Sequence, residues 1–122
     1  MFPKTVKIGG LIYKVAQVED LSRLEMVEDL AGMIYYREVE MKIDKDLPPQ
    51  IANHTLIHEM THGILQEAGY TEHEEEMADR IGKVLYQVLV DNDFNFLRPD
   101  IEITVDTDQS LGKQLAINER LM

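Results

Sequence analysis

Two histidines one helical turn apart, with a glutamate directly after the first, are the side chains best suited to chemistry in this sequence. They belong to the segment His58-Glu59-Met60-Thr61-His62. Residues i and i+4 share one face of a helix, so both imidazoles can reach one metal ion while Glu59 lies beside a metal-bound water. The segment therefore predicts a hydrolytic zinc site, with His58 and His62 as ligands and Glu59 as the general base.

The residues around this segment predict the helix that it needs. Pro48 and Pro49 are typical of a helix start, residues 51–66 contain no breaker except Gly63, and residues 67–69 are typical of a stop. Apolar residues bracket the motif on several sides: Leu56, Ile57, Ile64 and Leu65. Neutral rings on a buried helix need a polar partner, which a metal ion would supply. The alternative is a helix that carries two histidines by coincidence.

A catalytic zinc ion usually takes three protein ligands and leaves one position to water, so a third donor is needed. The chain has no cysteine that could supply a thiolate. The remaining candidates are imidazoles and carboxylates near the motif: His54, His73, Glu72, Glu74, Glu75, Glu76 and Asp79. The choice among them depends on how the next helix places its side chains.

Thr71 to Glu74 has the form of a capping box, which predicts that the second helix begins at Thr71 and that Glu74 binds its backbone amide. Glu76 then falls on the solvated face and Glu75 on the flank of the buried one. We therefore assign the third ligand to Glu75 and expect Asp79, one turn further on, to orient a ligand histidine. The buried face is expected to be an apolar stripe: Met77, Ile81, Val84, Leu85 and Val88.

The other candidates have simpler interpretations. Acidic residues at a helix N-terminus can merely complement its dipole, which is our interpretation of Glu72, Glu74 and Glu76 and the alternative for Glu75. His54 lies on the zinc face, yet histidines at i, i+4 and i+8 span about 12 Å along a helix, too far for one ion to reach both outer rings easily. We expect His54 in the core or lining a cleft, and His73 exposed.

These motifs resemble those of the gluzincins, zinc metallopeptidases in which a His-Glu-x-x-His helix is followed by a helix with Glu-x-x-x-Asp, matched here by Glu75 and Asp79. More closely, residues 55–64, together with 85–89 and 91–92, resemble the small phage and prophage metallopeptidases of the ImmA/IrrE-like kind. The resemblance covers residues 43–92. It implies a Zn²⁺-dependent hydrolysis of peptide bonds in a protein substrate, such as a regulator in a phage or mobile-element circuit.

The length of 122 residues allows one domain with a core and not two. We place a zincin-like metallopeptidase domain at residues 1–92 and an extension of unknown role at 93–122. Within that extension, residues 101–105 are typical of a strand and a terminal helix is expected from Leu111. The sequence has neither a membrane-spanning apolar run nor a signal peptide, and the lack of cysteine agrees with a cytoplasmic protein.

The net charge of −11, from 23 acidic and 12 basic residues, opposes binding to nucleic acid phosphates. An acidic cleft would attract a basic peptide or protein through long-range electrostatics. The simpler alternative is that the excess charge only maintains solubility.

The first strands are predicted at residues 5–8 and 11–15, which flank Gly9-Gly10, a link typical of a tight hairpin. Leucine and valine recur every three residues between Asp20 and Leu30, which indicates a short helix or an irregular crossing over the sheet.

A second pair of strands is predicted at residues 32–36 and 39–43 because apolar and polar residues alternate there. The fold class is therefore α+β, with a small antiparallel sheet of three or four strands packed on two helices. Residues 39–43 directly precede the motif helix, so we expect them to form the edge that binds substrate as an added strand.

The sequence does not identify a residue that stabilises the oxyanion; Tyr70, His73 and Tyr86 all stay open. A non-catalytic zinc-binding protein that acts as an interaction module is the alternative function, because relatives of enzymes can keep a metal site for folding or recognition.

Overall fold

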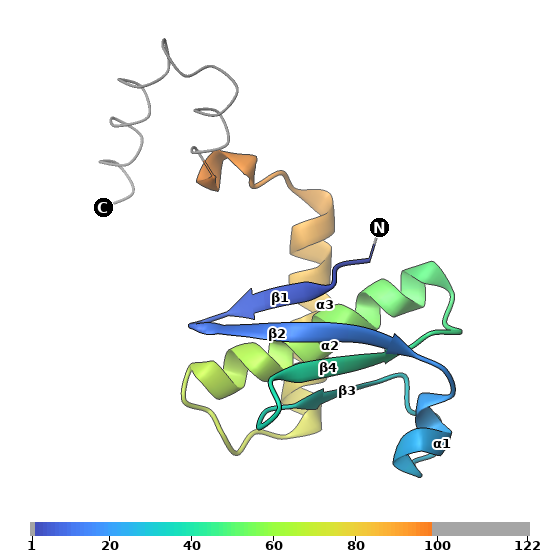
Figure 1. Cartoon of the computed structure of the whole chain (residues 1–122). Helices are drawn as coiled ribbons and strands as arrows, with labels where there is room; N and C mark the ends of the chain where they lie inside the picture. The colour runs from blue at the N-terminus through green and yellow to red at the C-terminus, as the bar shows by residue number, and fades with distance from the viewer. Residues whose placement is uncertain (1, 99–122) are drawn as a thin grey trace. The chain divides into compact units, whose positions relative to one another are not determined.

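The computed structural model describes residues 2–98 and contains four strands and three α-helices in that part of the chain (Figure 1). In chain order the elements are β1 (Thr5–Ile8), β2 (Leu11–Val18), α1 (Leu21–Glu25), β3 (Gly32–Tyr35), β4 (Glu40–Asp44), α2 (Pro49–Glu67), α3 (Glu75–Asp91) and the 3-10 turn η1 (Asn95–Leu97). The strand and helix predicted after residue 100 lie outside the described residues.

The predicted α+β class is confirmed, but the sheet is mixed and not antiparallel throughout. Its strand order is β1-β2-β4-β3, with antiparallel pairs β1/β2 and β3/β4 and a parallel pair β2/β4. Parallel neighbours need a crossover connection, which here consists of α1 and β3. The two hairpins were predicted from local patterns, whereas the way in which they join is set by packing over long sequence separations.

This strand order also corrects the predicted substrate edge. The strand predicted at residues 39–43 is β4, which lies between β2 and β3 and is hydrogen-bonded on both sides. Met41 and Ile43 on this strand are fully buried, as expected for an inner strand that faces the core. The edge of the sheet on this side is β3 (Figure 1).

Helix α2 packs on one face of the sheet and carries the motif. Pro49 is at its start, as predicted, and Ala52 and Leu56 contribute its side of the core. On the sheet side the core contains Ile8, Tyr13, Val15, Met41 and Ile43. The glutamate and the second histidine of the motif are buried in this position, so the helix is as enclosed as its apolar flanks predicted.

Helix α3 buries small residues and not the apolar stripe that we predicted. Ala78 and Gly82 are buried, whereas Met77, Ile81 and Val84 keep 38%, 43% and 61% of their surface exposed. The reason is close packing: a Cβ atom on Gly82 would lie 3.3 Å from the side chain of the α2 residue Thr61. Small residues at this crossing allow the two helix backbones to approach.

The start of α3 also differs from the prediction. The helix begins at Glu75, four residues after the expected start at Thr71, and the amides of Met77 and Ala78 donate to the carbonyl of Glu74. The predicted capping box is therefore not formed. Residues 71–74 remain a connecting segment between the two helices.

The contacts divide the chain into two compact units, and the first spans Met1–Gln87. It contains the sheet, α2 and α3 as far as Gln87. Among the described residues, no helix is long and apolar enough to cross a membrane.

Gly32, at the start of β3, lets the edge strand approach the motif helix. A Cβ atom at this position would lie 2.5 Å from Cγ2 of Thr55 and 3.3 Å from Cγ of Glu59. Thr55 cannot easily turn away, because its hydroxyl donates a hydrogen bond of 2.8 Å to the carbonyl of Ile51. The absence of a side chain at position 32 is therefore a packing requirement.

We predict that Gly32→Ala destabilises the fold by roughly 1–3 kcal/mol, the usual cost of overpacking a core. Gly10→Ala is the matched control, because a Cβ atom there would meet nothing within 4 Å. Urea unfolding of both variants measures the difference. Equal stability of the two variants would show that the contact between β3 and α2 is not tight.

Candidate metal centre

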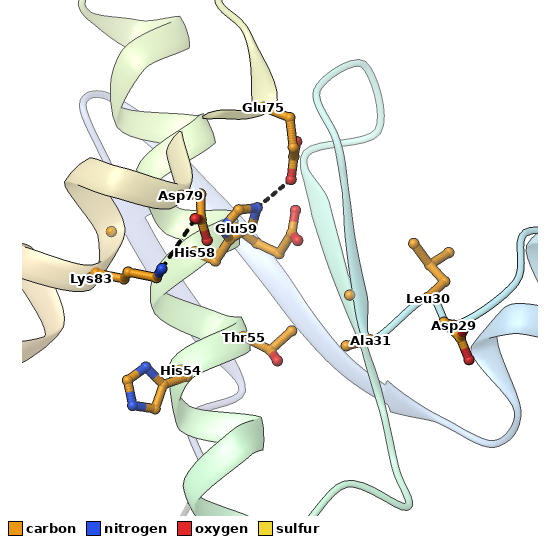
Figure 2. A pocket seen from close by; sticks show the side chains of 12 residues that line it. Asp29, Leu30, Ala31, His54, Thr55, His58, Glu59, Glu75, Asp79 and Lys83 are labelled. Atoms are coloured by element: carbon orange, nitrogen blue, oxygen red, sulfur yellow. Dashed lines mark hydrogen bonds and ion pairs between the residues drawn. The ribbon is translucent and has the colours of Figure 1, made fainter. Parts of the chain in front are cut away.

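Three side chains from two helices converge at one point, as the sequence predicted. Oε1 of Glu75 lies 2.5 Å from Nε2 of His58, and Oε2 of the same carboxylate lies 2.8 Å from Nε2 of His62. One ligand atom from each residue lies within 4.8 Å of the others. Figure 2 shows Glu75, at the first turn of α3, pointing toward His58 on α2. This group of three residues is a candidate metal site.

The donor set fits a divalent metal ion. Two imidazoles and one carboxylate are a common protein contribution to hydrolytic zinc sites that keep one position open. Burial lowers the pKa of His62, which favours the neutral ring that a metal ion requires. The Glu75 side chain is exposed, so an ion could enter from solvent. The geometry leaves the identity of the ion open.

Glu59 lies beside this group and is nearly inaccessible, with 6% of its surface exposed. Burial, and secondarily the charge of Glu75, raise the pKa of Glu59 to about 8. A cation bound by the neighbouring residues would act in the opposite direction. The protonation of Glu59 therefore depends on whether a metal ion is bound at the neighbouring residues.

A cavity of about 430 Å³ lies in front of these residues, bounded by α2, α3 and the segment that leads into β3. Figure 2 shows His54, His58 and Asp79 on one side and Asp29 to Ala31 on the other. His54 lines this cavity and stacks on Tyr86, with 3.7 Å between the ring centroids. Of the two positions expected for His54, the lining of a cleft is the one observed.

Asp79 and His73 make contacts that the sequence analysis did not predict. We expected Asp79 to orient a ligand histidine, but its carboxylate pairs with Lys83 on the next turn of α3, at 3.4 Å. His73, which we expected to be exposed, is half-buried, and its Nε2 lies 2.8 Å from Nδ1 of His62. The connecting segment before α3 thus supplies the ring that contacts the motif.

Tyr36, to which the sequence analysis gave no role in the site, is close enough to Glu59 for their charges to interact. Burial raises its pKa to about 12, with contributions from the charges of Glu59, Tyr13 and Glu75. Its hydroxyl therefore stays protonated near neutral pH and lies close enough to both glutamates to sense their charge. The sequence offered one indication of this position, because Tyr36 directly follows β3, the strand that packs on the motif helix.

Comparisons with protein-family models, with curated proteins and with solved structures give no match for this chain. What the chain shows is a candidate metal-binding group of two histidines and one glutamate, on two helices that pack against a mixed sheet.

The raised pKa of Glu59 predicts how the stability of chelator-treated protein depends on pH. A carboxyl group with a pKa near 4.5 when unfolded and about 8 when folded stabilises the fold fully below pH 4.5, and this contribution is lost as the pH rises through 8. We expect Glu59→Gln, which cannot ionise, to be more stable than the wild type by roughly 2–5 kcal/mol at pH 9 and by much less at pH 4.5.

Urea unfolding at both pH values in the presence of chelator measures this difference, with Glu76→Gln as the control for an exposed glutamate. The same stability difference at pH 4.5 and pH 9 would refute the assigned environment of Glu59.

Proposed function

We propose that this protein is a zinc-dependent metallopeptidase that hydrolyses peptide bonds in a protein substrate. The observation that carries the proposal is the convergence of His58 and His62 on the carboxylate of Glu75, with the buried Glu59 beside them at a cavity. This combination provides a metal site, a proton acceptor and room for a substrate in one place. If the two histidines were a coincidence, there would be no reason for Glu75, the buried Glu59 and a cavity to lie beside them.

In the proposed mechanism, His58, His62 and Glu75 would hold the zinc ion. A bound zinc ion supplies a Lewis acid that lowers the pKa of water from about 15.7 toward about 7 and polarises a carbonyl group. Glu59 accepts the proton of the attacking water at its carboxylate and passes it to the leaving amine.

The substrate backbone is proposed to bind along β3. Within residues 2–98 this strand pairs with β4 alone, and Gly32 at its start also lines the cavity. An extended peptide can add to such an edge through main-chain hydrogen bonds. Because Gly32 has no side chain, the backbone of β3 lies close to Glu59, which would bring a peptide added to this strand near that carboxyl group.

A basic substrate fits the charges of the cavity. Outside the proposed metal site its wall contains Asp29 and Asp79, and Lys83, the one lysine among the described lining residues, is paired with Asp79. The whole sequence carries a net charge of −11. Long-range attraction would therefore favour peptides rich in lysine and arginine. By resemblance to the small phage metallopeptidases, we propose a regulatory protein as the natural target.

The second candidate function is a zinc-binding interaction protein without peptidase activity. The exposed side chains of Met77, Ile81 and Val84 on α3 favour it, because an uncovered apolar helix face is typical of interaction surfaces. The two functions share the metal site and differ only in hydrolysis.

We predict that Glu59→Gln retains zinc and lowers hydrolysis by about 10²-fold or more, because the proton acceptor is lost and the ligands are not. His58→Ala should lose both zinc and hydrolysis. Metal analysis and chelator-sensitive cleavage of an unfolded, lysine-rich protein measure the two effects. Full hydrolysis by the Glu59→Gln variant would contradict the mechanism, and zinc binding by an inactive wild type would favour the interaction protein.

Glu75 and its neighbour Glu76 provide a second, matched test. We predict that Glu75→Gln weakens zinc binding by at least about 10-fold, because a ligand is removed, while Glu76→Gln leaves it unchanged. Glu76 pairs with Arg80 on the exposed face of α3, at 3.4 Å, and makes no contact with either motif histidine among the described residues. Competition with a chromophoric chelator measures both affinities. Equal losses in the two variants would rule out Glu75 as a specific ligand.

A further inference from the structure

The ring of His62 is contacted on both of its nitrogen atoms. Its Nε2 lies 2.8 Å from Oε2 of Glu75, and its Nδ1 lies 2.8 Å from Nε2 of His73. The other nitrogen of His73, Nδ1, lies 2.6 Å from the backbone carbonyl oxygen of Tyr70. A continuous chain of contacts thus leads from the end of α2 through two imidazole rings to the candidate metal site.

The donor and acceptor of each hydrogen bond in this series follow from the backbone carbonyl of Tyr70 at its end. A backbone carbonyl oxygen only accepts, so Nδ1 of His73 must donate to Tyr70. A neutral His73 ring then has a lone pair on Nε2, which accepts a hydrogen bond from Nδ1–H of His62. The neutral His62 ring is thereby left with a lone pair on Nε2. That atom faces Glu75, and the two facing lone pairs can share either a proton or a metal ion.

The backbone carbonyl of Tyr70, which sets these hydrogen-bond directions, is held in place by the end of α2. Gly69 has a φ of 101°, a conformation that residues with side chains rarely adopt. The amides of Gly69 and Tyr70 donate to the carbonyls of Gln66 and Leu65, at 3.1 and 2.8 Å. This is the hydrogen-bond pattern of a Schellman motif, which fixes the peptide that follows the helix.

We propose that His73 is a positioning residue, which holds the His62 ring in the orientation and tautomer that leave Nε2 free for the metal ion. This inference rests on the proposed zinc site. His73 thus orients a ligand histidine, the role that we had expected of Asp79, and the histidine concerned is His62. The rings of His62 and His73 also pack on each other, with centroids 5.0 Å apart and planes tilted by 30°.

Two variants of His73 separate hydrogen bonding from packing. His73→Phe keeps an aromatic ring against His62 but removes the acceptor, so we expect it to weaken zinc binding about 10- to 100-fold, the usual effect of losing such a partner. His73→Gln restores an acceptor and a donor and should bind zinc within about 3-fold of the wild type. Glu72→Gln, an exposed neighbour in the same segment, is the control and should not change the affinity.

Zinc affinity is measured by competition with a chromophoric chelator, and ¹⁵N spectra of the zinc-loaded protein report the histidine tautomers. The inference predicts a proton on Nδ1 of His62 in the wild type and in His73→Gln. It is overturned if His73→Phe binds zinc as tightly as the wild type, or if His73→Gln loses as much affinity as His73→Phe. A wild type that takes up no zinc overturns the metal site itself, and the two failures are therefore distinguishable.

Discussion

The candidate site depends on the close approach of α3 to α2. Gly82 has no Cβ atom, and one placed there would lie 3.5 Å from the Cα atom of His58 itself. Because Ala78 and Gly82 occupy this crossing, the first residue of α3 comes within hydrogen-bonding distance of both motif histidines. A larger side chain at the crossing would separate the helices and move the Glu75 carboxylate away from the rings.

Charge is the second constraint on this site. The cavity wall gathers several carboxylates, of which Asp79 is paired with Lys83 and Glu75 contacts two imidazoles. Glu59 is buried close to Glu75, and the pKa of Glu59 rises as a result. A divalent cation held by the candidate ligands would offset this repulsion. The same arrangement that destabilises ionised Glu59 is thus suited to a metal ion.

Local features of this fold could be predicted from the sequence, and long-range ones could not. The hairpin at Gly9-Gly10 and the extent of the motif helix follow from local spacing, and the motif spacing also indicated Glu75 as the partner of the histidines, although their convergence depends on how α3 packs on α2. Glu75 was chosen for a partly wrong reason, however, since α3 begins later than predicted and leaves Met77, Ile81 and Val84 of the predicted apolar stripe exposed. The parallel pairing of β2 with β4 and the contact of His73 with His62 depend on how distant segments pack, which periodicity does not encode.

The most direct test is an anomalous diffraction measurement at the zinc edge on crystals of zinc-loaded protein. The structure predicts one strong peak, about 2.0–2.2 Å from Nε2 of His58, Nε2 of His62 and the carboxylate of Glu75, with Glu59 beside it and not bound to it. No peak at these three side chains, in protein that was dialysed against zinc, would contradict the central claim.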